Sequence, residues 1–113
     1  MPVELSYEKC RLTAVLSGEI DHHHAAFLRE RIDQAMARHQ PATLVLDFDE
    51  VTFMDSSAVG LVMGRFKLLS AYGGGLEVQG LSPAAYRMMQ LSGLQTLAKL
   101  TPKSQTEKAG NRR

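Results

Sequence analysis

The chain has 113 residues, of which 44% are hydrophobic and 22% are charged, and its formal net charge is +1. This length fits one domain with a sizeable core, and the near-neutral balance excludes a general attraction to nucleic acid or to a membrane surface. The single cysteine, Cys10, cannot form an internal disulfide and favours the reducing cytoplasm. No stretch approaches the roughly 18 apolar residues of a membrane span, and the first residues lack the pattern of a signal peptide. We therefore expect a cytoplasmic domain with no nucleic-acid or membrane partner.

The first part of the chain predicts two paired strands and a helix. Strand-forming residues occupy about 10–17 and end at Gly18, and a partner strand is expected near 3–7. Apolar residues then recur at helical spacing, with Asp21 as the N-cap and Pro41 after the helix end.

The remainder alternates between strands and helices. Strands are expected at 43–48, 76–80 and about 97–100. One helix lies within 53–75 and stops at three glycines, and another starts at Ser82 and ends at Gly93. This alternation implies parallel crossovers, so the predicted class is α/β, with a mixed, mostly parallel sheet of about five strands and three to four helices. Residues 1–100 form the expected single domain, and 101–113 a polar, disordered tail.

Three consecutive histidines, His22 to His24, begin the first helix. Consecutive helical residues point about 100° apart, so the three rings cannot face one metal ion. A zinc pair on a helix needs spacing i and i+4, and position 26 is Ala26. We therefore expect a solvated helix start, or part of a contact surface, and no metal site.

Two serines, Ser56 and Ser57, stand where the third strand gives way to a helix. A hydrolase elbow needs glycines two residues to either side of its serine, and neither serine has them. The sequence also lacks the GxxxxGK[ST] phosphate loop. A hydrolase or nucleotide-binding enzyme is thus a lesser alternative, and no cofactor is expected.

The same serines suit a surface switch. If Asp55 caps the helix, Ser56 and Ser57 occupy its first turn with exposed hydroxyls. A helix N-terminus presents unpaired N–H groups and about half a positive charge, which favours a phosphate there. Phosphorylation is therefore expected to leave the fold intact and to change what the surface binds. Asp21 is expected at the same end of the sheet, where it and Asp55 would hold a basic residue of a partner.

The helix after the serines contains Gly60 and Gly64, each of which costs about 1 kcal/mol relative to alanine. The expected core face consists of four apolar residues: Val59, Val62, Phe66 and Leu69. Leu61 and Leu68 fall outside that face. Two interpretations remain open here: a helix packed on both sides inside the domain, or a face left for a partner.

Three stretches carry a family resemblance: GEIDHHHA (18–25), FMDSSAVGLVMGRFK (53–67) and SPAAYRMMQLSGL (82–94). In this order and spacing they closely resemble the anti-sigma factor antagonists of the STAS family, over nearly all of residues 3–100. The histidines after GEID favour the sporulation (stage II) branch over the stress-response branch.

The resemblance implies a binding protein that is not an enzyme. Unphosphorylated members bind an anti-sigma factor that is itself a serine kinase, which supplies ATP and magnesium, and this binding frees a sporulation sigma factor. The kinase then phosphorylates the first serine of the DSS motif, here Ser56, and a serine phosphatase reverses the reaction. The aspartate of the GELD-type motif, which contacts the kinase, falls on Asp21.

The expected partner-binding residues are Asp21, Asp55, Ser56, Ser57, Val59, Gly60 and Met63. Two positions depart from the family pattern. Ala58 stands where glycine is expected, which would stiffen the helix start and alter how closely a partner approaches, and His24 replaces a small polar residue. The alternative function is a STAS-like accessory domain of a transport or stress-response regulatory complex.

Overall fold

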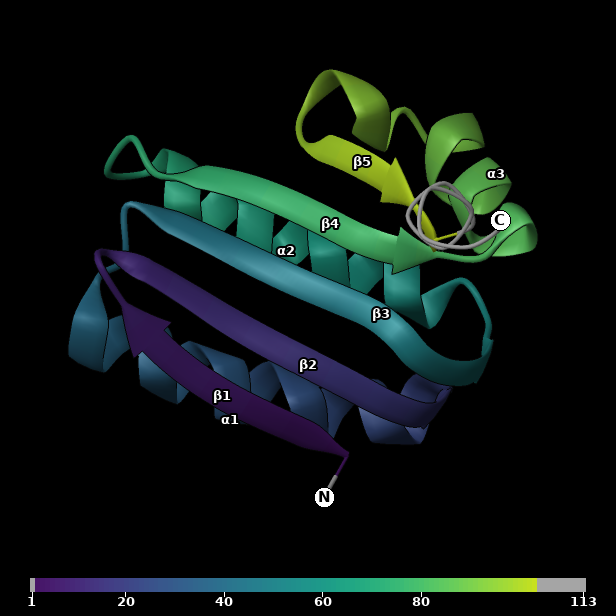
Figure 1. The fold of residues 1–113 in the computed structure, drawn as a ribbon, viewed down its shortest axis with the longest axis horizontal. Helices are drawn as coiled ribbons and strands as arrows, with labels where there is room; N and C mark the ends of the chain where they lie inside the picture. The colour runs from purple at the N-terminus through teal and green to yellow at the C-terminus, as the bar shows by residue number, and fades with distance from the viewer. Residues whose placement is uncertain (1, 104–113) are drawn as a thin grey trace, which may run out of the picture.

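A computed structural model describes residues 2–103 of the chain. Its elements, in chain order, are β1 (Val3–Glu8), β2 (Arg11–Ile20), α1 (His22–His39), β3 (Thr43–Met54), α2 (Ser57–Ser70), β4 (Gly75–Leu81), α3 (Pro83–Leu91), a 3-10 turn (Leu94–Thr96) and β5 (Lys99–Pro102). The five strands form one sheet in the order β1-β2-β3-β4-β5 (Figure 1). The β1–β2 pair is antiparallel and the other pairs are parallel. The predicted α/β class and mixed, mostly parallel sheet are confirmed.

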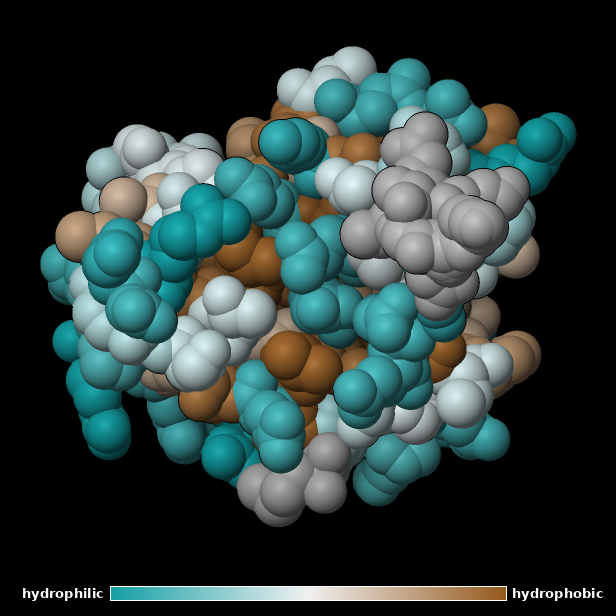
Figure 2. Space-filling model, viewed as in Figure 1, coloured by the Kyte–Doolittle hydropathy of each residue, from teal (hydrophilic) through white to brown (hydrophobic). Residues whose placement is uncertain are grey.

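The helices α1 and α2 lie side by side on one face of the sheet, and α3 lies at the β4–β5 end (Figure 1). Alternate residues of β2, namely Leu12, Ala14 and Leu16, point into the core beneath these helices. The opposite face of β1 to β4 carries mainly hydrophilic side chains around a few hydrophobic ones (Figure 2). The sheet therefore has one face in the core and one face open to solvent.

Two strands are longer than the sequence predicted. β2 continues past Gly18 to Ile20, and β3 continues past position 48 to Met54, because these extensions pair with each other. The pairing shifts register between Val15 and Ser17 and again between Gly18 and Glu19. Gly18 adopts a φ of +81°, so it belongs to an irregularity within the strand and does not end it.

The helix ends follow the predicted capping. The Asp21 side chain caps α1, and Gln40 closes it in a left-handed conformation ahead of Pro41. The Ser82 hydroxyl accepts a hydrogen bond from the Ala85 N–H at the start of α3. Beyond it, β5 covers 99–102, so it extends into the segment expected as tail, and residues 104–113 lie outside the described residues.

The buried face of α2 differs from the predicted one. It consists of Ala58, Leu61, Val62, Arg65 and Leu69. Leu61 is therefore in the core, whereas Val59 and Phe66 are only partly buried. The Arg65 Nε lies 2.9 Å from Asp33 Oδ1 on α1, without the alignment of a hydrogen bond. Burial raises the pKa of Asp33, and the positive charge of Arg65 offsets part of that rise. Because the buried face of α2 includes an arginine, the pattern of apolar residues alone indicated a different face of the helix.

Candidate partner-binding site

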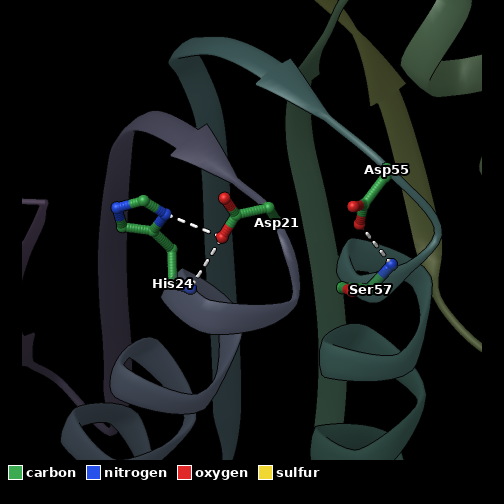
Figure 3. Close-up of polar contacts among 4 residues, drawn as sticks. All are labelled: Asp21, His24, Asp55 and Ser57. Carbon is green, nitrogen blue, oxygen red and sulfur yellow. Dashed lines mark hydrogen bonds and ion pairs between the residues drawn. The ribbon is translucent and has the colours of Figure 1, made fainter.

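The starts of α1 and α2 lie next to each other because they follow paired parallel strands. Ile20 and Met54 are register partners at the ends of β2 and β3. Just beyond them, the Asp55 N–H donates to the Ile20 carbonyl oxygen at 3.2 Å. Figure 3 shows the result: Asp21 and Asp55 stand at neighbouring strand ends, each above the first turn of its own helix. The prediction that Asp21 and Asp55 lie at the same end of the sheet is confirmed.

Asp21 is held by two hydrogen-bonding contacts with His24 (Figure 3). Its Oδ1 accepts from the His24 backbone N–H at 2.8 Å and lies 2.8 Å from the ring Nδ1. These contacts stabilise the charged carboxylate and hold its pKa below the ordinary value, with the backbone N–H contributing most. His24 thus has a role that the sequence analysis missed, although its position three residues after an N-cap was the available signal.

Asp55 fixes the start of α2. Its Oδ1 accepts from the Ser57 backbone N–H at 2.8 Å (Figure 3). Ser56, between them, already has helical backbone angles, is exposed, and makes no side-chain capping bond. Ser57 is half-buried. The Ser56 hydroxyl is therefore exposed and takes no part in capping the helix.

The backbone amides of this first turn are already occupied. Ala58 N–H donates to the Asp55 carbonyl oxygen at 3.0 Å, and the amides of Val59 and Gly60 both donate to the Ser56 carbonyl oxygen. With the Ser57 amide on Asp55, four successive N–H groups have partners. The expectation that these N–H groups are unpaired is wrong, because hydrogen bonds to residues two to four positions earlier satisfy them. For residues 57–60, the helix dipole remains to favour an anion.

The outer surface of α2 is open beside these residues. Apart from its chain neighbours and the adjacent backbone of α2, a Cβ added at Gly60 or Gly64 would meet no atom within 4 Å. Neither glycine is therefore required by packing inside the domain, which favours the interpretation of a face left for a partner. Gly60 is exposed, whereas Val59 and Met63 are partly buried and contribute only part of their surface. Ala58 is fully buried, so its methyl group faces the core and not an approaching partner, contrary to the expectation.

An exposed aromatic side chain adjoins the site on the other side. Phe53, on the extension of β3, is 56% exposed. It lines a groove of about 280 Å³ between this extension and α3, together with Met54 and Met88. The sequence analysis placed no strand here and so missed both features.

Two of the three histidines at the start of α1 contact each other. His23 and His24 meet edge to face, with ring centroids 6.0 Å apart. Within residues 2–103, no group of three or more histidine, cysteine or acidic side chains is arranged to hold a metal ion. No helix in this same range has the length and apolar character needed to cross a membrane.

This fold and this site define a class: a small α/β binding domain with two capped helix starts at one edge of its sheet. The family model described as the STAS domain matches residues 7–107. The chain belongs to the STAS domain family.

Similar proteins carry more specific names. An anti-sigma F factor antagonist of Paenibacillus polymyxa is 36% identical over 94 residues, which make up 83% of this chain and 80% of that protein. The anti-sigma-B factor antagonist of Bacillus subtilis (strain 168) is 32% identical over 90 residues, 80% of this chain and 81% of that one. The anti-sigma factor antagonist SpoIIAA in its unphosphorylated form superimposes with a TM-score of 0.76 at 30% identity, covering 92% of this chain and 91% of that chain. The Bacillus SpoIIAA in the phosphorylated form gives a TM-score of 0.71 at 30% identity, covering 92% and 95%.

Proposed function

We propose that this protein is a cytoplasmic anti-sigma factor antagonist of the sporulation type. In its unphosphorylated state it binds an anti-sigma factor that is also a serine kinase, and a sigma factor is thereby released. The names of its relatives support the general role. The observation that carries the switch is the exposed Ser56, which stands at the start of α2 outside the capping network.

The two carboxylates supply the charge that a basic partner residue needs. Each uses Oδ1 for the cap of its own helix, and the second oxygen is the one that would accept a charge-assisted hydrogen bond from arginine or lysine. Because Asp21 and Asp55 stand on adjacent strand ends, one partner surface can contact both. Ser57, Val59, Gly60 and Met63 complete the proposed contact surface on α2.

Phosphorylation would end this contact by charge. The kinase transfers the γ-phosphoryl group of its own ATP to Ser56 Oγ. A new P–O ester bond forms as the bond between the γ-phosphoryl group and ADP breaks, ADP leaves, and the hydroxyl proton passes to solvent. The product carries about −1.5 to −2 charges beside two carboxylates, so a surface that matched basic residues becomes crowded with anions. A change of about 1.4 kcal/mol in binding free energy already alters affinity tenfold. A serine phosphatase restores the hydroxyl.

The test is the affinity for the anti-sigma kinase encoded in the same genome, measured by calorimetry with purified proteins. Ser56→Ala should bind but accept no phosphate, and Ser56→Asp should bind at least about tenfold more weakly. Ser82→Asp is the matched control, because it adds the same charge at another helix N-cap and should bind like the wild type. Phosphate on Ser57, found by mass spectrometry, or undiminished binding by Ser56→Asp, would refute the assignment.

A second candidate is an antagonist of the stress-response branch, which the 32% identity to the anti-sigma-B factor antagonist favours. It would use the same surface with a different anti-sigma factor. Binding measured in parallel against anti-sigma factors of both branches decides between them, since the true partner should bind more tightly and lose affinity with Ser56→Asp.

A further inference from the structure

A second groove lies away from Ser56, between the strand β1 and the helix α1. It has a volume of about 270 Å³, and side chains from both elements line it. Its wall at one end is the stacked pair of Tyr7 and His39, whose ring centroids are 4.1 Å apart. Along α1, the residues Arg31, Gln34 and Arg38 line the other side at spacings that place them on one helix face.

The strand beside this groove is an edge of the sheet, with α1 behind it (Figure 1). The Ser17 N–H donates to the Pro2 carbonyl oxygen, which fixes positions 2 and 17 as a hydrogen-bonded pair. Because such pairs alternate along an antiparallel ladder, the N–H and C=O groups of Val3, Leu5 and Tyr7 point away from β2. These groups form a template to which another strand can add.

The charged side chains that α1 and β1 themselves carry on the two sides of this edge have opposite signs. Among the described residues, no ion pair joins Arg31 or Arg38 to an acidic side chain, and none of the residues lining the groove is acidic. On the open face of the sheet, β1 carries Glu4 and Glu8, both exposed. A second copy paired antiparallel through β1, with the same faces aligned, would bring these glutamates together, which disfavours self-pairing of that kind.

We propose that the β1 edge docks an extended segment of a protein partner, which adds as a further strand of alternating charge. Its acidic side chains face Arg31 and Arg38, and its basic side chains lie beside Glu4 and Glu8. The hydrogen bonds to Val3, Leu5 and Tyr7 supply affinity without regard to sequence, and the charge alternation supplies selectivity. This surface is separate from the Ser56 site, so both can be occupied at once.

The probe for this proposal is a synthetic peptide of alternating glutamate and lysine, titrated into the full chain and followed by amide NMR and calorimetry. Shifts are expected at β1 and along the second half of α1. A peptide of the same composition with like charges in pairs should bind more weakly, because both of its faces are then mixed. N-methylation of the alternating peptide should also reduce binding, since it removes backbone donors without changing charge.

Protein variants complete the test. Arg31→Gln combined with Arg38→Gln should lower the affinity for the alternating peptide roughly tenfold or more. Lys67→Gln combined with Arg87→Gln removes the same charge from exposed positions on α2 and α3 and should leave binding unchanged. Equal binding by the paired-charge or N-methylated peptide would overturn the proposal, as would shifts away from β1. Self-association of the peptide-free chain through the β1 amides, seen by sedimentation and NMR, would assign the edge to a second copy instead.

Discussion

Asp21 caps the start of α1 through its carboxylate. Its contacts with the backbone N–H and ring of His24 favour its charged form and lower its pKa. A carboxylate whose pKa is lowered by folding adds stability at pH values above its unfolded pKa, about 3.9, and loses that contribution as the pH falls through the folded pKa. Asn at an N-cap serves almost as well as Asp, so Asp21→Asn removes the charge and keeps the cap.

We therefore expect the Asp21 carboxyl carbon to titrate with a midpoint below about 3.9 when followed by NMR. We also expect the stability advantage of the wild type over Asp21→Asn to be present at neutral pH and to disappear as the pH falls below about 4, through the folded pKa. A midpoint at or above the ordinary value would contradict the role assigned to His24.

A second residue-scale constraint is Gly80, which lines the groove beside Phe53. Its φ is +71°, and an added Cβ would lie 2.7 Å from the backbone nitrogen of Asp49. Gly73 has a similar φ of +84° but open space around it. Gly73→Ala therefore measures the cost of backbone strain without the steric clash. Gly80→Ala should lower the free energy of unfolding by about 1–3 kcal/mol more than Gly73→Ala does, measured in denaturant. Equal losses would mean that the backbone near Asp49 yields easily.

At the scale of the element, α2 combines a closed inner stripe with an open outer surface. The inner stripe uses Ala58, Leu61, Val62, Arg65 and Leu69. Outside it, Gly60 and Gly64 have no neighbour that excludes a methyl group. Packing within the domain thus gives no reason for two residues that each weaken the helix. The proposed contact with an anti-sigma factor would supply one.

This gives opposite expectations for stability and for binding. Gly60→Ala should raise the free energy of unfolding by about 0.5–1 kcal/mol, because alanine restricts the unfolded chain and suits the helix. The same methyl group, one turn from Ser56, should weaken binding to the anti-sigma kinase. Gly64→Ala is the control one turn further along, with a similar gain in stability and a smaller loss of affinity. If Gly60→Ala binds as tightly as the wild type, Gly60 lies outside the contact surface.

The strand extensions show which element boundaries could not be predicted from the sequence. Residues 49–54 of β3 include two acidic side chains and follow a buried apolar run, and the sequence analysis ended the strand at 48 and placed residues from 53 onward with the helix. They form a strand because β2 offers a continued partner beyond Gly18. Pairing of this kind depends on a distant segment, whereas periodicity reports only on neighbours.

For the whole molecule, the order and type of the main elements were predictable because hydrophobic period, caps and glycines agree along the chain. The placement of Asp21 and Asp55 at the same end of the sheet was predictable, since neighbouring parallel strands end at one edge. The phase of α2 was not, because it is set by a buried arginine paired across to α1. The occupied amides around Ser56 were not either, because they depend on local geometry that several backbone conformations could have provided.

The whole-molecule consequence of phosphorylation follows from where Ser56 stands. The phosphate would change the net charge from +1 to roughly −1, which alters every long-range interaction of a small domain. Its local cost should be small, because Ser56 is exposed and its side chain takes no part in capping. We expect Ser56→Asp to unfold within about 0.5 kcal/mol of the wild type in denaturant.

Ala58→Asp is the comparison variant for Ser56→Asp, because it places the same charge two residues later. Ala58 is fully buried, so the carboxylate would enter the core without a partner. Its loss of stability should exceed about 3 kcal/mol. If both expectations hold, a phosphoryl group at position 56 would act as a signal without unfolding the domain that carries it. Destabilisation of Ser56→Asp comparable to that of Ala58→Asp would show that marking the protein also unfolds it, and the proposed reversible switch would fail.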